Sequence, residues 1–174
     1  MASEVKGRWR AAIEVPGSGT LNAGGNAQVE SVSCASAGNC AAGGLYSDRS
    51  RRGQAFVASE VNGMWRAAIE LPGSGKLDAG GRAATLKSVS CASAGNCAAG
   101  GYYTDGSGHT QAFVASEVNG NWRAAIQVPG TGTLNAGGEA GVDSVSCASA
   151  GNCAAGGSYR DGSGHGQAFV VSQT

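Results

Sequence analysis

Short segments of alternating apolar and polar residues run along the chain, and no segment shows a sustained apolar period of 3.6 residues. Four such segments follow one another in the middle of the chain and predict strands at residues 86–91, 97–103, 111–118 and 122–128. In the first, strict alternation places Leu86, Ser88 and Ser90 on one face and Lys87, Val89 and Cys91 on the other. Glycine interrupts every candidate helix, so we expect an all-β fold without helices.

Turn signals separate the predicted strands. Asn119-Gly120 is the strongest, because both residues accept the positive φ angles of a type I′ hairpin turn. Residues 92–96 and 104–108 have the glycine, asparagine and aspartate content of tight hairpin loops. Pro129-Gly130 ends the fourth strand, and residues 131–141 form a longer crossover. The four strands therefore predict an antiparallel meander.

The meander is repeated along the chain. The string SVSCASAGNCAAGG occurs three times, at residues 31–44, 88–101 and 144–157, with offsets of 57 and 56 residues. A fixed period of this size indicates stacked supersecondary units. We predict one repeat domain over residues 1–174, which divides into residues 1–30 (a fourth strand plus crossover), 31–87 (repeat 1), 88–143 (repeat 2) and 144–174 (a truncated repeat 3 that an N-terminal strand completes). The near-identity of the copies indicates recent duplication or deliberate assembly.

A four-stranded meander joined to its copy by a crossover is typical of a propeller blade, so we predict a β-propeller with three blades of about 57 residues per chain. The alternative is a β-trefoil monomer, which also has three repeats of four strands. Trefoil cores rely on large aliphatic residues, whereas alanine dominates these strands. The propeller is therefore favoured.

The repeat is permuted relative to the chain, which suggests an assembly. The chain opens with a fourth strand that lacks its own blade and closes with a third strand that lacks a fourth. Three blades are fewer than the typical four to eight of a closed propeller. We therefore predict a six-bladed homodimer of about 34 kDa, twice 17.0 kDa, in which residues 9–15 of each chain complete the last blade of the partner.

The pattern S-V-S-C…C-A-A-G-G-x-Y…Q-A-F-V-A-S-E-V-N-G-x-W, in residues 31–66, 88–123 and 144–172, resembles the cysteine-paired blade repeats of secreted actinobacterial β-propeller proteins. The resemblance covers nearly the whole chain. It implies a propeller fold and a secreted protein. Because propellers carry lectins, scaffolds and enzymes alike, it implies little about function.

Composition and charge exclude several classes of function. The 174 residues include 12 Lys and Arg and 12 Asp and Glu, so the net charge of zero supplies no field to attract nucleic acid or an anionic membrane surface. No stretch approaches the roughly 18 consecutive apolar residues of a membrane span. We expect neither nucleic acid nor a membrane as a partner.

Six cysteines form three C-x5-C pairs that flank the first hairpin turn of each repeat: Cys34 with Cys40, Cys91 with Cys97, and Cys147 with Cys153. Antiparallel pairing would bring each pair to disulfide distance. Zinc is the alternative, but two histidines in the whole chain cannot complete three four-ligand sites. We predict three disulfides and no metal, and hence a secreted parent protein whose leader is missing from this sequence.

No set of residues suggests catalysis or a cofactor. His109 and His165 lie in predicted hairpin loops with Asp105 and Asp161, and the first repeat has no histidine. The two aspartates are expected to form turns rather than to bind calcium, because each stands alone among glycines. We therefore expect no enzyme activity and no cofactor.

Aromatic and arginine residues recur at fixed places in the repeat. The candidate ligand-binding residues are Trp9, Arg10, Tyr46, Trp65, Arg66, Tyr103, Trp122, Arg123 and Tyr159. The simpler interpretation makes each tryptophan a packing anchor between blades. The functional one uses aromatic faces to stack on sugars and arginine to bind their hydroxyls, at sites between blades whose repetition would add avidity. We predict a non-enzymatic, lectin-like propeller that binds glycans at several sites. The alternative is a structural scaffold or an engineered repeat propeller without a ligand of its own.

Overall fold

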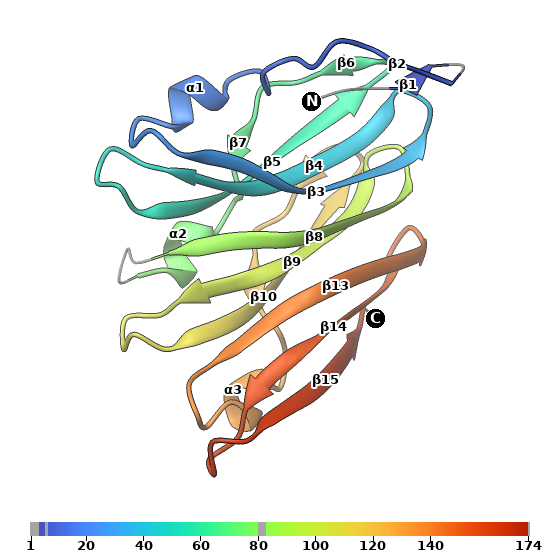
Figure 1. Cartoon of the computed structure of the whole chain (residues 1–174). Helices are drawn as coiled ribbons and strands as arrows, with labels where there is room; N and C mark the ends of the chain where they lie inside the picture. Colours follow the sequence, from blue (N-terminus) through green and yellow to red (C-terminus); the bar gives the residue numbers. More distant parts are fainter. Residues whose placement is uncertain (1–3, 6, 80–82, 174) are drawn as a thin grey trace.

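The computed structural model describes residues 4–5, 7–79 and 83–173. The chain is all-β, with three antiparallel sheets of three to five strands that correspond to the three repeats (Figure 1). We call these sheets unit 1, unit 2 and unit 3, in chain order. A short N-terminal hairpin precedes unit 1.

Within each unit the strands follow one another as a meander. The N-terminal hairpin consists of β1 (Glu4–Val5) and β2 (Arg8–Trp9). Unit 1 consists of β3 (Ala27–Ser36), β4 (Asn39–Ser47), β5 (Gly53–Val61), β6 (Met64–Trp65) and β7 (Ile69–Glu70). Unit 2 consists of β8 (Ala84–Ser93), β9 (Asn96–Thr104), β10 (Thr110–Val118), β11 (Asn121–Trp122) and β12 (Ile126–Gln127). Unit 3 consists of β13 (Ala140–Ser149), β14 (Asn152–Arg160) and β15 (Gly166–Ser172).

The predicted fourth strand, residues 122–128, is split into β11 and β12, both of which pair with β10. Between them, the backbone N–H of Ala125 donates to the carbonyl of Pro72 in the preceding crossover, at 2.7 Å. The chain therefore leaves the ladder of its own sheet to bond to the neighbouring segment. The Asn-Gly turn before β11 has the expected geometry, with φ of 50° at Asn119 and 78° at Gly120.

The expectation of no helices is wrong in detail. Each crossover contains one four-residue helical turn: α1 (Ser18–Leu21), α2 (Ser74–Leu77) and α3 (Thr131–Leu134). A left-handed glycine begins each turn, with φ between 77° and 85° at Gly17, Gly73 and Gly130. A single turn is too short to show a 3.6-residue period, which is why the sequence pattern gave no sign of it.

The predicted faces of the first strand are also wrong. Leu86 and Val89 are both buried, at 0% and 5% exposure, in one cluster that joins unit 1 to unit 2. The cause is a register shift between Leu86 and Ser88, which inserts Lys87 as an extra residue. The same shift occurs between Val29 and Ser31 in β3. The bulge turns two apolar side chains toward the same neighbouring sheet.

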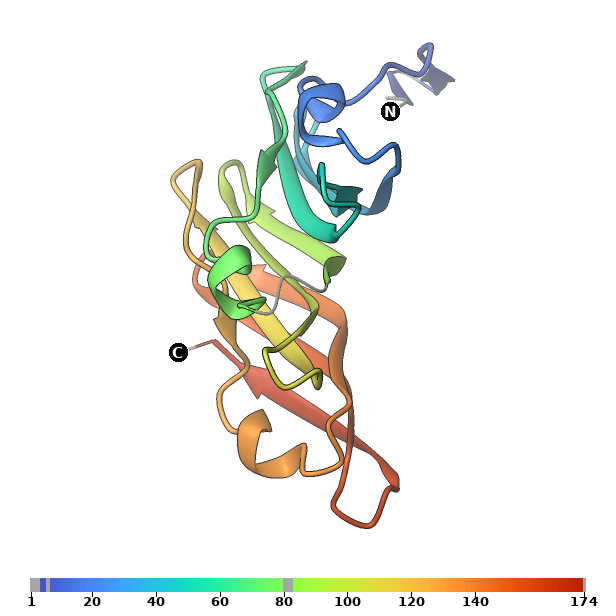
Figure 2. The ribbon, with the colours of Figure 1, turned by 90° about the vertical axis from the view of Figure 1, so that its left-hand side faces the viewer.

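The three sheets are stacked face to face in chain order, with units 1 and 3 at opposite ends (Figure 2). The stack is therefore open rather than a closed ring. The apolar core lies between the sheets, with one cluster at each boundary. At each boundary a glycine allows close approach: a Cβ on Gly43 would lie 2.7 Å from Leu86 Cδ1, and one on Gly100 would lie 2.5 Å from Val142 Cγ1. Small residues in the strands therefore set the spacing between units.

Candidate functional site

Three disulfides join the predicted pairs, Cys34–Cys40, Cys91–Cys97 and Cys147–Cys153. In each pair the two residues are direct partners in the register of an antiparallel hairpin, with Cα atoms 3.9 to 4.0 Å apart. Each bridge closes the hairpin between the first two strands of a unit. Within the part of the chain that the structure describes, no cysteine is free.

The three tryptophans lie in different surroundings. Trp9 in β2 is 71% exposed, whereas Trp65 and Trp122 are partly buried and pack against the apolar clusters. The indole Nε1–H of Trp122 donates to Ser59 Oγ of unit 1, at 3.3 Å. The Nε1–H of Trp65 is buried and has no acceptor among the described residues. At Trp122 the indole thus joins two units, as the simpler interpretation requires.

The tyrosines lie at the other end of the sheets. Tyr103 is opposite Gln111 in β10, and Trp122 is opposite Glu117. Six residues of extended strand separate those positions, which is about 20 Å. The structure therefore does not bring the tyrosines and tryptophans of the candidate set together.

Tyr46 and Tyr103 are buried, at 4% and 5% exposure, and Tyr159 is half-buried. Burial raises the pKa of both Tyr46 and Tyr103; for Tyr46, the charge of Glu70 and the hydrogen bond from its hydroxyl to Glu70 Oε2 at 3.1 Å add to the effect. Such rings offer little face to a ligand. Arg10, Arg66 and Arg123, by contrast, are exposed.

A groove of about 390 Å³ lies between units 1 and 2, at the end of the sheets where the tryptophans are. We call it the polar groove. Its polar lining residues are Asn39, Ser59, Glu60, Arg66, Ser93, Glu117 and Asn119. Of these, only Arg66 belongs to the residues singled out from the sequence. The others stand in strings that repeat between units, ASEVNG and SAGNC, and repetition was the one signal that could have marked them.

A hydrogen-bonded joint lines the polar groove. Ser59 Oγ of unit 1 donates to Glu117 Oε1 of unit 2 at 2.8 Å, and Trp122 donates to the same hydroxyl. Glu117 is only 3% exposed, and its burial raises the pKa of its carboxyl, while the hydrogen bond from Ser59 lowers it in part. The joint fixes the orientation of a buried carboxyl across the boundary between two units.

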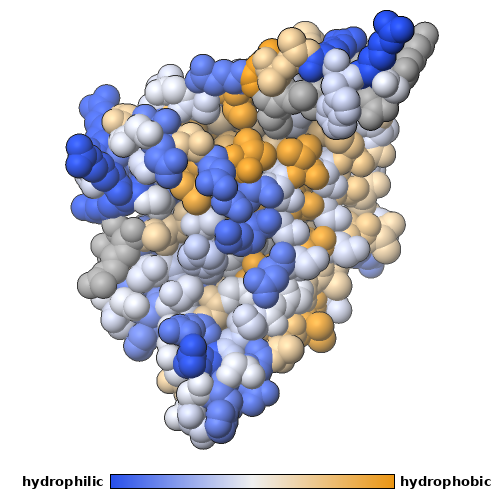
Figure 3. Space-filling model, in the orientation of Figure 1, coloured by the Kyte–Doolittle hydropathy of each residue, from blue (hydrophilic) through white to orange (hydrophobic). Residues whose placement is uncertain are grey.

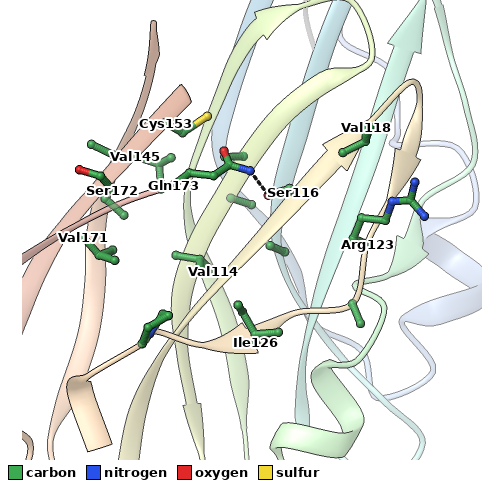
Figure 4. Close-up of a pocket in the computed structure, with 17 residues that line it drawn as sticks. Val114, Ser116, Val118, Arg123, Ile126, Val145, Cys153, Val171, Ser172 and Gln173 are labelled. Atoms are coloured by element: carbon green, nitrogen blue, oxygen red, sulfur yellow. Dashed lines mark hydrogen bonds between the residues drawn. The ribbon is translucent and has the colours of Figure 1, made fainter. Parts of the chain in front are cut away.

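The same joint recurs between units 2 and 3, where Gln173 Nε2 donates to Ser116 Oγ at 3.2 Å (Figure 4). A smaller groove of about 230 Å³ accompanies it, lined by Asn96, Ser116, Glu117 and Gln173 together with turn residues of unit 3. The chain therefore carries two polar grooves of related design, one at each boundary.

A third groove, of about 460 Å³, runs beside the second joint (Figure 4). We call it the apolar groove. Val114, Val118 and Ile126 of unit 2 line one side, and Val145 and Val171 of unit 3 line the other. Arg123 and Pro129 also line it. This groove has few polar groups with which to orient a ligand.

The aspartates of the hairpin loops form turns, as expected. Asp105 Oδ1 accepts hydrogen bonds from the backbone N–H groups of Ser107 and His109, at 2.9 and 3.0 Å, and Asp161 does the same in unit 3. Burial alone would raise the pKa of Asp105, but these bonds and one from Gln111 outweigh it and hold the pKa below its usual value. His109 and His165 are exposed.

Among the described residues, no group of three or more His, Cys, Asp or Glu side chains is placed to hold a metal ion. None of the described helices is long and apolar enough to cross a membrane. Comparison with models of known protein families and with curated proteins finds no match for this chain.

Proposed function

We propose that the chain is a segment of a β-propeller with three blades of about 57 residues, and that it acts as a non-enzymatic, lectin-like protein that binds glycans at the polar grooves between blades. The observation that carries this proposal is the recurrence of a polar groove and its hydrogen-bonded joint at both boundaries. Repeated shallow sites are the arrangement that gives avidity on a surface with many glycans.

The stacking of the units supports the propeller over the trefoil. Each unit is a separate meander of three to five strands, and its apolar contacts are made with neighbouring sheets. In a β-trefoil the strands of all three repeats would share one barrel. Close approach of sheets at glycine and alanine is what blades require.

The chemistry of the polar groove suits a neutral polyhydroxylated ligand. Carboxylate, amide, hydroxyl and guanidinium groups can accept from and donate to sugar hydroxyls. The exposed guanidinium of Arg66 stands at the groove, and Asn39 is fixed because its Oδ1 accepts from the backbone N–H of Asn62 at 3.3 Å. Trp122 contributes by orienting Ser59 rather than by offering a stacking face. This site differs in composition from the set expected from the sequence.

The alternative is a scaffold without a ligand, and one observation favours it. Ser59, Glu117 and Trp122 bind one another, so the joint is complete without a ligand. A structural role would account for its repetition equally well.

The three disulfides support a secreted protein, because such bridges persist in oxidising compartments. Extracellular glycans are also found there.

A glycan array followed by calorimetric titration tests the proposal. We expect the oxidised protein to bind at least one class of neutral glycan, and Arg66→Ala to weaken that binding about tenfold, the effect of losing one good hydrogen bond to a charged group. Arg49→Ala is the matched control, because Arg49 is an exposed arginine outside the lining of the polar groove. No signal on the array at millimolar sugar would support the scaffold.

A further inference from the structure

Strands β5 and β10 each carry a short segment along one edge. The backbone N–H of Leu71 donates to the carbonyl of Ala55, and that of Val128 donates to the carbonyl of Ala112, both at 2.9 Å. Val57 is paired with Ile69 in the first case. These segments, residues 64–71 and 121–128, complete units 1 and 2.

Strand β15 is the counterpart of β5 and β10, but among the described residues it pairs only with β14. Val170 takes the place of Val57, yet it is 89% exposed whereas Val57 is fully buried. A free edge beside an exposed apolar side chain invites pairing with another strand.

Residues 8–15 have the sequence that fits this edge. They read RWRAAIEV, against MWRAAIEL at 64–71 and NWRAAIQV at 121–128. Beyond β2 they form no strand, and Trp9 is 71% exposed. We propose that residues 8–15 of one chain dock on the β15 edge of a second copy, so that two chains close head to tail into a ring of two times three units.

The register follows from the two occupied edges. The backbone N–H of Val15 donates to the carbonyl of Ala168 in the second copy, and Ile13 lies opposite Val170, as Ile69 lies opposite Val57. In this docking β2 gives up its pairing with β1, in which Trp9 is opposite Glu4. Trp9 then enters the apolar groove of Figure 4, with its indole Nε1–H directed at Ser116 as that of Trp122 is at Ser59. The groove is thus the seat of the docking strand.

A second series of contacts fits the same docking independently. The N–H of Ala68 donates to the carbonyl of Pro16, and the N–H of Ala125 to the carbonyl of Pro72, both at 2.7 Å. The next members of the series are the N–H of Ala12 and the carbonyl of Pro129, and neither has a backbone partner within the described part of the chain. Docking joins them.

The space around the glycine that follows each of these prolines is also consistent with the docking. A Cβ on Gly17 would lie 3.1 Å from Ala67, and one on Gly73 would lie 3.0 Å from Ala124, whereas nothing described lies within 4 Å of a Cβ on Gly130. The docked segment brings Ala11 of the second copy to that position.

The outer faces of units 1 and 3 are also suited to pack on each other in the ring. Val32 on unit 1 is 50% exposed, whereas its counterpart Val89 is 5% exposed against unit 1. Apolar atoms are exposed over the first sheet in Figure 3. In the ring, this face packs on the outer face of unit 3, so each exposed end covers the other.

Light scattering after gel filtration of the oxidised chain measures the assembly. We expect about 34 kDa, twice the 17.0 kDa of one chain. Two variants interrupt opposite sides of the contact: Val170→Asp charges the accepting edge, and Ala12→Pro removes the donating N–H. Each alone is expected to elute near 17 kDa with an unchanged circular dichroism spectrum. Met64→Asp is the matched control, because Met64 is 72% exposed but lies outside the contact, and it should remain dimeric.

Mixing the two variants decides how the chains are joined. The Val170→Asp chain keeps a functional donor segment and the Ala12→Pro chain keeps a functional edge, so a head-to-tail contact restores a dimer in the mixture. A native mass near 17 kDa, dimers that survive both substitutions, or a mixture that stays monomeric would each overturn the proposal.

Discussion

Units 2 and 3 have nearly the same sequence but bury different amounts of it. Ala112 in β10 is fully buried, whereas its counterpart Ala168 in β15 is exposed; Val114 is half-buried and Val170 is 89% exposed. Unit 2 lies between two sheets and its β10 edge is covered by β11 and β12, whereas, within the part of the chain that the structure describes, unit 3 has one neighbouring sheet and an unpaired β15 edge. Burial in this protein therefore depends on position in the stack rather than on the repeat itself.

The largest difference in stability is expected between an apolar side chain buried between two units and one exposed on the edge of unit 3. Leu86→Ala removes a fully buried side chain between units 1 and 2 and should lower the free energy of unfolding by about 3 kcal/mol. Val170→Ala should change it by less than about 0.5 kcal/mol in a dilute, monomeric sample. Denaturant titrations measure both. Equal effects would mean that the two surfaces are buried alike.

A matched pair of glycines gives the next largest effect. Gly100→Ala places a Cβ 2.5 Å from Val142 Cγ1 and should destabilise the chain by about 1–3 kcal/mol. Gly156 holds the same position in unit 3, where the nearest atom would lie 3.6 Å away, so Gly156→Ala should be close to neutral in the monomer. In the proposed dimer Gly156 faces Val29 of the second copy, and the same substitution should weaken dimerisation. Tolerance of both substitutions in thermal unfolding would contradict the close approach of units.

The two joints offer a smaller comparison. Ser59→Ala leaves the buried carboxyl of Glu117 and the indole of Trp122 without their partner, which should cost about 1–3 kcal/mol. In the monomer, Ser116→Ala leaves only Gln173, which is exposed to water, and should cost less than about 0.5 kcal/mol. The ranking, read from unfolding midpoints, is the test. A larger loss of stability at Ser116 than at Ser59 would contradict the stabilising role given to the joint between units 1 and 2.

The smallest effect is a pH dependence. Because the pKa of Glu117 is raised in the folded chain, the folded state holds its proton at pH values where the unfolded state has released it. Stability contributed by this group is therefore lost as pH rises from the ordinary glutamate value of 4.5 through the raised one. The variant Glu117→Gln has at this boundary the uncharged amide that Gln173 has at the other. Its free energy of unfolding, relative to that of the native chain, should therefore rise as pH rises through that window. A stability difference that stays constant with pH would show that Glu117 does not titrate this way.

Much of the fold could be predicted from the sequence because the signals were local and repeated. The hairpin turn at Asn119-Gly120 and the bridge Cys91–Cys97 each depend on residues close together in the chain. The bulge at Lys87 could not be predicted, because one extra residue in a ladder leaves no mark in a single strand. The split of the fourth strand depends on Pro72 in another unit, which no local pattern reveals.

The candidate site was predictable only in part. Arg66 was identified from its place beside a repeated tryptophan, and it does line the polar groove. Ser59 and Glu117 were not identified, because they come from different units and meet only once the sheets stack. The tyrosines were identified only because they recur at one position of the repeat. In the structure, the length of β10 separates them from the tryptophans.

Amide hydrogen exchange tests the central claim most directly, because the chain contains its own standard. In the assembled protein, the amides of Ala12 and Val15 should exchange as slowly as those of Ala68 and Leu71, which make the corresponding hydrogen bonds within unit 1. Dilution below the dissociation constant should release the first pair and leave the second protected. Rapid exchange of Ala12 and Val15 at every concentration would contradict the docking of residues 8–15 on a second copy.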